Sequence, residues 1–336
     1  MNILLWHVHG SWTTSFVQGK HRYLVPVNPA RDEWGRGRAR TFDWPDTVEE
    51  LPLEDIRDAR IRDARIRDNG RGDNGTGDIG IGDIDVAIAQ RPEELDLIPP
   101  HVPVIYVEHN TPKGDVPNSR HPLADRDDLV IAHVTDFNDL FWDTGATRTT
   151  VIDHGIVEPK ARWTGELDRL AVVTNEPVRR GRVTGTDLFG RFAAVAPLDV
   201  FGMGVAGLER AGLEGVTAFD DPPQHVMHTE VARRRAYLHL CRWTSLGLSL
   251  IEAMQMGMPV VALATTEAVA AVPPDAGVLA TKVDTLVEAA QWLIDEPEAA
   301  ARMGERARQV ALAKYGLDRF LADWDRLLEE ETCASR

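Results

Sequence analysis

The sequence predicts an α/β fold made of two domains, each with its own parallel sheet. The chain has 336 residues, more than a single hydrophobic core usually organises, since domains commonly run to ~100 to 200 residues. It is 43% hydrophobic and 27% charged, as expected for a globular protein. Short apolar runs recur along it, each ending in polar residues or glycine, with helical patterns between and after them. Buried parallel strands have this appearance.

Apolar runs predict the strands of the first half. The N-terminus, MNILLWHVHG, begins with one and is expected to be the first strand. The runs that follow are DVAIAQ (85–90), VPVIYVEHN (102–110), LVIAHVT (129–135) and TTVIDHG (149–155). Parallel sheets bind ligands at the carboxyl ends of their strands. The polar residues at these ends are therefore candidates for one crevice: His9, His109, Thr135 and His154.

The second half repeats this pattern and ends in helices. Its expected strands are LAVVTN (170–175), LDVFGMG (198–204), AYLHL (236–240), MPVVAL (258–263) and AGVLA (276–280). Helical patterns occupy 283–297 and 298–316, and apolar residues at helical spacing continue through 317–331. We expect domains at 1–160 and 161–314, a hinge within 157–168, and a final helix over 315–330. The cleft between the domains is the expected active site.

A low-complexity stretch interrupts the first half at residues 56–84. It repeats IRDAR and then alternates aspartate with glycine, as at Asp73, Asp78 and Asp83. Calcium-binding loops use similar carboxylates, but they also need a bidentate acid at the twelfth position or several stacked repeats, which this stretch lacks. We interpret it as a solvated insertion, with calcium binding as the alternative.

The charge balance argues against nucleic-acid partners. Acidic residues outnumber basic ones 53 to 37, and the formal charge of -16 repels polyanions. No apolar run approaches the ~20 residues that cross a bilayer, and the N-terminus lacks the basic start of a signal peptide, so a cytoplasmic protein is expected. Cys241 and Cys333 lie far apart without CxxC spacing, which indicates no disulfide framework.

One ionisable residue, Glu252, lies within the apolar and glycine-punctuated stretch TSLGLSLIEAMQMGMPVVA (244–262). Together with the ATTEAVAAV that follows Leu263, this stretch resembles the donor-binding signature of family 4 retaining glycosyltransferases. HGIV (154–157) and IDEPEAAARMGERAR are similar to the family's interdomain connection and penultimate helix, so the resemblance covers residues 85–330. It implies the GT-B fold, in which two Rossmann-like domains face a central cleft and the C-terminal helix crosses back to the first domain.

The resemblance assigns donor binding to the start of the helix that contains Glu252. The backbone amides of Leu246, Gly247 and Leu248 are expected to hold a diphosphate, because glycine permits close approach and the first amides of a helix lack internal partners. The Glu252 carboxylate, about two turns into the helix, is expected to accept hydrogen bonds from the ribose diol.

The chain departs from the family pattern at Thr244, where the family has a glutamate that contacts the donor sugar. A threonine hydroxyl supplies one oxygen and no charge, so the resemblance leaves the donor sugar open. Ser245 adjoins Thr244 in the expected donor site. Glu267, in the loop after the next strand, is the candidate to replace part of the missing acid.

A basic cluster, RRGR at 179–182, is expected to neutralise the donor diphosphate. The resemblance places Arg179 at the family's arginine and Thr184 at its lysine, so Arg182 or Arg180 is expected to supply the second cation. Negative charge on a departing diphosphate needs such cations when no metal is present. The alternative is a solvated loop cluster.

The first domain is expected to supply a catalytic histidine. VPVIYVEHN resembles the family's strand that ends in a histidine beside the anomeric region of the donor sugar, which makes His109 the catalytic candidate. Glu108 is expected either to partner His109 or to face the acceptor.

The acceptor side is expected to include His9, Gly10 and Ser11, which follow the first strand and whose backbone amides can support a phosphate or an acceptor. We expect His7 and His9 to lie on opposite faces of that strand, with only His9 facing the cleft. The same expectation argues against a zinc site formed by His7, His9 and His109.

These features predict transfer of a sugar from a nucleoside diphosphate donor to a small soluble hydroxyl or amine acceptor. The resemblance implies retention at the anomeric carbon, with neither metal nor cofactor, and removal of the acceptor's proton by the departing phosphate. The alternatives are an epimerase or phosphorylase of the same fold, and a sugar-nucleotide-binding partner protein without activity.

Overall fold

The computed structural model describes residues 1–40, 42–58, 84–210 and 212–334. The chain divides into two compact units, Met1–Gly155 with Leu317–Arg336 (unit 1) and Ile156–Gly316 (unit 2). The sequence-based boundaries at 160 and 314 differ from these divisions by a few residues. The aspartates considered for calcium lie outside the described residues. No helix within the described part is long and apolar enough to cross a membrane.

Unit 1 is built on a parallel sheet of seven strands in the order β3-β2-β1-β4-β5-β6-β7. The chain runs outward from β1 in one direction and from β4 in the other, and ligands of such sheets bind where the order reverses. The strands are β1 (Asn2–Leu5), β2 (Arg22–Val27), β3 (Val48–Pro52), β4 (Val86–Ala89), β5 (Val104–Glu108), β6 (Leu129–His133) and β7 (Arg148–Val151).

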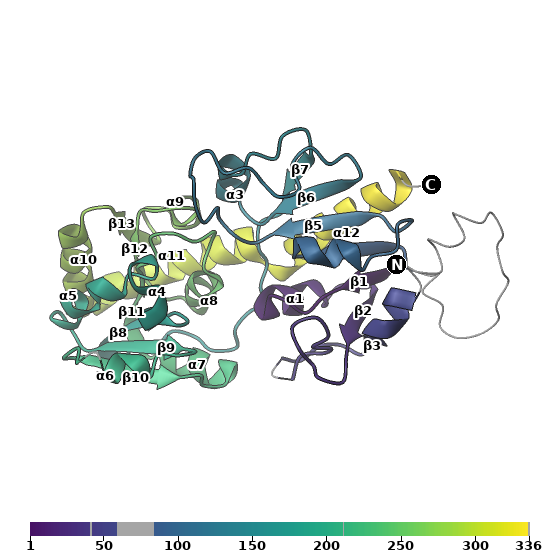
Figure 1. Cartoon of the computed structure of the whole chain (residues 1–336). Coiled ribbons are helices and arrows are strands. Elements are labelled where there is room, and N and C mark those ends of the chain that lie inside the picture. The colour runs from purple at the N-terminus through teal and green to yellow at the C-terminus, as the bar shows by residue number, and fades with distance from the viewer. Residues whose placement is uncertain (41, 59–83, 211, 335–336) are drawn as a thin grey trace, which may run out of the picture. The chain divides into compact units, whose positions relative to one another are not determined.

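The C-terminal helix α12 (Leu317–Ala334), yellow in Figure 1, belongs to unit 1 and contacts β4 and α1 (Gly10–Phe16). Trp324 of α12 is buried, with its ring centroid 5.6 Å from that of Trp12 and 5.0 Å from that of Phe16. The predicted amphipathic helix is confirmed, because its apolar face packs into this core: Leu317, Phe320, Leu321, Trp324, Leu327 and Leu328. Unit 1 also contains η2 (Pro92–Asp96) and α3 (Asp136–Phe141).

Unit 2 has a second parallel sheet, of six strands in the order β10-β9-β8-β11-β12-β13. Its strands are β8 (Leu167–Val173), β9 (Leu198–Gly202), β10 (Val216–Asp220), β11 (Arg234–His239), β12 (Val260–Leu263) and β13 (Gly277–Ala280). Its helices are α4 (Pro177–Arg180), η3 (Gly181–Val183), η4 (Thr186–Leu188), α5 (Phe189–Ala193), α6 (Gly207–Arg210), α7 (Gln224–Val231), α8 (Leu248–Met256), α9 (Ala268–Ala271), α10 (Val283–Asp295) and α11 (Pro297–Tyr315).

Each apolar run named in the sequence forms a strand, but three strands were not predicted. β3 and β10 are edge strands whose residues are largely half-buried or exposed, so neither carries a continuous apolar run. β2 lies inside the sheet although it contains Pro26, a residue that argues against an internal strand.

Candidate functional site

Helix α8 carries the residues expected to bind the donor. It begins after Gly247, with no acidic residue in its first turn and no side-chain cap, so no side chain that the structure describes accepts a hydrogen bond from its first amides. Gly257 ends the helix in the left-handed conformation, with φ 90°, as the sequence predicts. Residues 250–256 are all buried, so packing on all sides holds α8 in place.

The loop that leads into α8 lies close against the end of β11. A Cβ atom on Gly247 would lie 2.8 Å from Cε1 of His239, so only glycine permits this approach without a shift. Burial lowers the pKa of His239 to about 4, which keeps the ring neutral at pH 7. His239 was not predicted, although a polar residue at the carboxyl end of a strand is the signal that marked the histidines of the first half.

Glu252 lies one turn into α8, not two as expected, and is buried. Its Oε1 accepts a hydrogen bond from Gln224 Nε2 at 3.1 Å, and its Oε2 lies 3.3 Å from His228 Nε2, both on α7. The His228 contact has ion-pair distance only, since that nitrogen makes no aligned hydrogen bond among the described residues. A carboxylate offers about four lone-pair sites, so these contacts leave room for another donor.

The neighbours of α8 differ in burial. Thr244 is half-buried, whereas Ser245 and Leu246 are buried in the loop before the helix. Glu267 is also buried, and its Oε1 lies 3.7 Å from Lys314 Nζ of α11. The acid considered as a substitute for the missing glutamate is therefore directed at a cation of its own unit.

The three clustered arginines have different partners. Arg179 and Arg182 are 70% and 75% exposed, and they form ion pairs with Glu176 and Asp187. Arg180, the last residue of α4, is half-buried and forms no ion pair with any residue that the structure describes. The hydrogen bond with Arg179 lowers the pKa of Glu176, and the charge of Arg180 adds to this through space.

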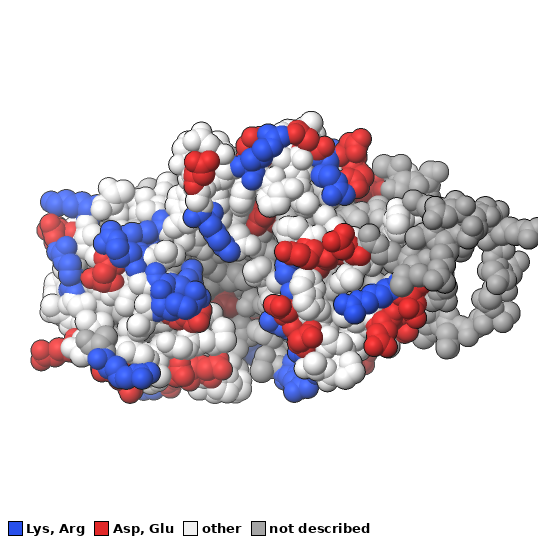
Figure 2. Space-filling view, viewed as in Figure 1, with Lys and Arg blue, Asp and Glu red and all other residues white. Residues whose placement is uncertain are grey.

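The segment that follows α4 lies beside the loop that joins β11 to α8, because the Arg242 backbone N–H donates to the Val183 carbonyl at 2.8 Å. Burial raises the pKa of the Cys241 thiol in that loop, and the charge of Arg180 opposes the rise. Arg242, which was not predicted from the sequence, ties the loop to η3 and η4, because it donates to the Arg182 carbonyl of η3 at 2.7 Å and to Asp187 Oδ1 of η4 at 2.6 Å. Figure 2 shows basic side chains gathered on this face of unit 2 around α4.

In unit 1, three histidines meet at the carboxyl edge of the sheet. The ring centroid of His109, after β5, lies 4.0 Å from that of His9 and 6.4 Å from that of His154. Thr135, the fourth residue expected there, caps α3 instead, because its Oγ1 accepts the backbone N–H of Asn138 at 3.1 Å.

Burial keeps these three histidines neutral. It lowers the pKa of His9 to about 4, that of His154 to about 3, and that of His109 well below its ordinary value. His109 Nε2 and His154 Nδ1 have no hydrogen-bond partner among the described residues. Such imidazoles are weak bases at neutral pH, so they suit hydrogen bonding and positioning better than proton abstraction. The described residues contain no group of three or more His, Cys, Asp or Glu arranged to hold a metal ion.

The expectation that His7 and His9 lie on opposite faces of the first strand is wrong, because residues two apart in a strand point to the same face and because β1 ends before both residues. The two histidines nevertheless lie in different surroundings. His7 Nδ1 lies 3.1 Å from the Gly37 carbonyl, whereas His9 precedes α1, whose first residues are Gly10 and Ser11.

Glu108 is buried at the end of β5. Its Oε2 lies 2.9 Å from His121 Nε2, and its Oε1 accepts the backbone N–H of Asn110 at 2.6 Å. The two carboxylate oxygens therefore bind residues other than His109.

The sequence and the structure are both similar to those of known proteins. Residues 214–310, which include α8, match the family model described as glycosyl transferases group 1. Among solved structures, sucrose-phosphate synthase from Thermosynechococcus elongatus is 13% identical with a TM-score of 0.70, and the alignment covers 99% of this chain and 100% of that one. HepE from Anabaena, in complex with UDP, is 14% identical with a TM-score of 0.68 and coverages of 98% and 99%.

A glycosyltransferase from Rickettsia africae ESF-5 is also similar, at 10% identity, with a TM-score of 0.63 and coverage of 98% of both chains. No curated protein matches the sequence. The structural likenesses confirm the predicted fold. The chain has the GT-B fold, and the match over residues 214–310 supports a glycosyltransferase of that fold.

Proposed function

We propose that the protein transfers a sugar from a nucleoside diphosphate donor to a small hydroxyl- or amine-bearing acceptor, with retention at the anomeric carbon. The observation that carries this proposal is the anion-binding character of the loop before α8. The helix start has no side-chain cap among the described residues, and Arg180 supplies a positive charge that no described acid pairs with. Family 4 membership and a cytoplasmic location belong to the same proposal.

The donor is proposed to lie along α8. Its diphosphate accepts hydrogen bonds from the first amides of the helix, and its ribose diol donates to Glu252, which Gln224 holds in place. Thr244 contacts the sugar through its hydroxyl. HepE was solved with UDP-glucose as well as UDP, which makes uridine diphosphate sugars the first donors to test.

The proposed reaction proceeds on one face of the sugar. The bond between the anomeric carbon and the β-phosphate oxygen breaks, the acceptor oxygen or nitrogen bonds to the same face, and the acceptor's proton passes to the departing diphosphate. A protein base is not needed in this scheme, which suits the neutral and weakly basic His109. His109 is proposed to position the sugar, and Arg180 to stabilise the charge that develops on the diphosphate.

The direct test is a turnover assay. The protein is incubated with UDP-, GDP-, ADP- and dTDP-glucose, each with and without a panel of small hydroxyl and amine acceptors, and nucleoside diphosphate release is measured. We expect release that depends on the acceptor, and a product whose anomeric proton coupling in NMR shows retention. An altered sugar nucleotide without acceptor would indicate an epimerase, and an inverted product would contradict the mechanism.

The second candidate is a sugar-nucleotide-binding partner protein without activity. It is favoured by Thr244 at the place of an acid and by the acidic partners that already occupy Arg179 and Arg182. Calorimetry separates the two functions, because nucleotide binding without turnover of any donor supports the partner protein.

A further inference from the structure

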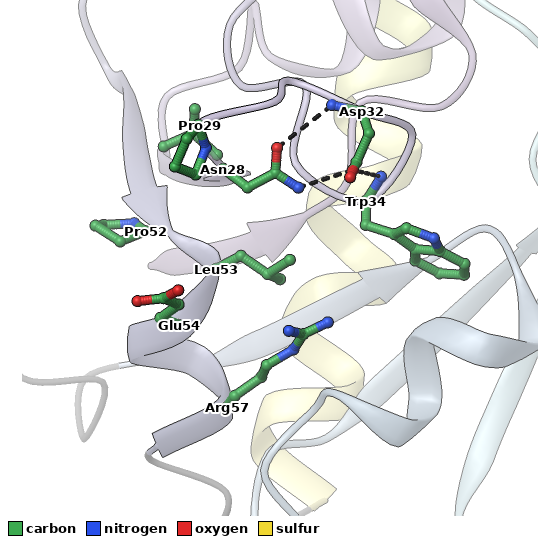
Figure 3. Close-up of a pocket in the computed structure, with 9 residues that line it drawn as sticks. Asn28, Pro29, Asp32, Trp34, Pro52, Leu53, Glu54 and Arg57 are labelled. Atoms are coloured by element: carbon green, nitrogen blue, oxygen red, sulfur yellow. Dashed lines mark hydrogen bonds between the residues drawn. The ribbon is translucent and has the colours of Figure 1, made fainter.

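A cavity of about 290 Å³ lies in unit 1 at the carboxyl ends of β2 and β3 (Figure 3). Its apolar wall is formed by Val27, Pro29, Pro52 and Leu53. Small-molecule sites commonly measure ~300 to 1,000 Å³, so this cavity has the size for one small ring.

The loop that forms one side of the cavity, residues 28–37, folds back on itself. The Asn28 backbone N–H donates to the Gly35 carbonyl at 3.0 Å, and a Cβ atom on Gly35 would lie 2.5 Å from the Asn28 nitrogen, so the two segments touch. Asp32 Oδ1 accepts hydrogen bonds from Asn28 Nδ2 at 2.7 Å and from the Trp34 backbone N–H at 2.9 Å, as the dashed lines in Figure 3 show. The loop therefore presents Asp32 in a fixed position.

Trp34 supplies a flat apolar surface to the same cavity. The Arg91 guanidinium lies over this indole, with 4.3 Å between its carbon and the ring centroid. Arg91 is itself held by Glu94, whose Oε1 accepts its Nε–H at 2.8 Å, and it donates to the Glu33 carbonyl at 2.9 Å. Because the guanidinium stacks on the indole, the ring is held in one orientation before any ligand arrives.

Three charged side chains line the opening: Asp32, Glu54 and Arg57. Glu54 and Arg57 form no ion pair or hydrogen bond through their side chains with any residue that the structure describes, and in Figure 3 Arg57 extends between Leu53 and Trp34. Hydrogen bonds from Asn28 and Trp34 hold the pKa of Asp32 below its ordinary value, and the charge of Arg57 lowers it further. Two carboxylates and one guanidinium leave a net negative charge around the opening.

We propose that this cavity binds a single-ring polyol that carries no negative charge. Hydroxyl groups donate to the carboxylates of Asp32 and Glu54, and Arg57 donates to a ring or hydroxyl oxygen. The C–H faces of the ring contact Trp34 and the prolines. An amine on the ring strengthens binding, because it meets the net negative charge, whereas a phosphate weakens it.

The cavity lies at the same edge of the sheet as the clustered histidines. Its loop reaches the segment after β1, where His7 Nδ1 lies 3.1 Å from the Gly37 carbonyl. The polyol is therefore assigned as the sugar acceptor, an assignment that rests on the proposed function. Binding itself does not depend on that function.

The test measures binding of glucose, glucosamine and glucose 6-phosphate to the full chain by ligand-observed NMR and calorimetry. We expect glucosamine to bind most tightly, glucose next and glucose 6-phosphate most weakly. Glu54→Gln, which disturbs no described contact, should weaken glucosamine binding about 3- to 10-fold, the effect of one lost hydrogen bond. Trp34→Ala should weaken all three sugars.

Matched changes in unit 2 serve as controls. Trp292→Ala removes an indole that is 43% exposed on α10, and Glu288→Gln neutralises an exposed acid of the same helix. Both residues line a separate cavity of unit 2, so unchanged sugar binding in these variants assigns the sugar to the cavity of unit 1. The proposal is overturned if no sugar binds, if glucose 6-phosphate binds most tightly, or if Glu54→Gln binds glucosamine like the wild type.

UDP binding, measured on the same samples, separates this proposal from the proposed function. UDP binding without polyol binding would refute the cavity assignment and leave the transferase proposal standing. Polyol binding sensitive to Glu54→Gln, with no nucleotide binding, would support the cavity and refute the transferase proposal. If both ligands bind, Glu54→Gln should raise the KM for the polyol acceptor and leave the Kd for UDP unchanged.

Discussion

Arg180 is expected to dominate nucleotide affinity among the three clustered arginines. Arg180→Gln removes a half-buried cation beside the β11–α8 loop that pairs with no described acid. The same change at Arg179 or Arg182 removes an exposed side chain whose charge a neighbouring acid already offsets. The three variants lie within four consecutive residues and each removes one positive charge, so each serves as a control for the others.

The magnitudes follow from the partners of each arginine. A hydrogen bond to a charged group contributes roughly 1.5 to 3 kcal/mol, so Arg180→Gln should raise the Kd for UDP roughly 10- to 150-fold. Exposed ion pairs contribute about 0 to 1 kcal/mol, and loss of Arg179 or Arg182 should change the Kd less than about 5-fold.

Calorimetry with UDP at low and high salt measures the Kd of each variant and how that Kd depends on salt. The affinity of the wild type should fall as salt rises, and Arg180→Gln should depend less on salt, since it lacks the cation that contacts the diphosphate. An equal loss of affinity in all three variants would show that the cluster acts only through its summed charge. A loss confined to Arg179→Gln or Arg182→Gln would refute the assignment of Arg180.

Three further outcomes test the site and its surroundings. Unit 1 should lose stability as pH falls from 6.5 towards 4, by roughly 1.4 kcal/mol per pH unit for each of His9 and His154. Their pKa values of about 4 and about 3 keep both side chains neutral in the folded protein, whereas the unfolded histidines bind protons over this pH range. Urea unfolding at pH 7 and pH 5 measures this, and a histidine-to-glutamine change at either site should reduce the pH dependence. Gly247→Ala should lower the free energy of unfolding by about 1 to 3 kcal/mol, since the new Cβ would overlap His239, and an unchanged urea midpoint would show that the ring moves aside. Glu252→Gln should weaken UDP binding about 10-fold or more, because the side chain no longer offers a negative charge to the ribose hydroxyls. The melting temperature should change little, because the amide oxygen still accepts a hydrogen bond.

The fold was predictable because buried parallel strands carry continuous apolar runs. VAIA of β4 and VVAL of β12 are buried at every position and could be read directly from the sequence. The edge strand β10 is largely half-buried, so its residues carry no such signal. Apolar runs therefore located most inner strands together with the edge strands β7 and β13, and missed the edge strands β3 and β10 and the inner strand β2.

In the candidate site, the end of α8 was predictable because it depends on the backbone conformation of a single residue. Gly257 predicted the end of α8. The close approach of Gly247 to a diphosphate stays a prediction, and in the structure its backbone lies against His239, which was not foreseen. Glu176 stands three residues before Arg179 and four before Arg180, and both spacings allow an ion pair on a helix, so spacing alone does not say which arginine lacks an acidic partner. Side-chain pairing between loops is set by tertiary structure.

The cavity beside Trp34 was not predicted, for the same reason. Its walls come from the ends of β2 and β3, two strands that the sequence did not reveal, and from the loop between them. The stacking of Arg91 on Trp34 joins residues far apart in the chain. Only the folded sheet places these residues together.

The central claim is that the amino end of α8 holds the diphosphate of a nucleotide. Amide hydrogen exchange with and without UDP tests it most directly, because the first amides of an uncapped helix exchange quickly until a ligand accepts them. We predict that UDP slows exchange in the segment 246–251 of the wild type, and slows it much less in Arg180→Gln. Protection that falls elsewhere in the chain, or no protection at saturating UDP, would contradict the claim.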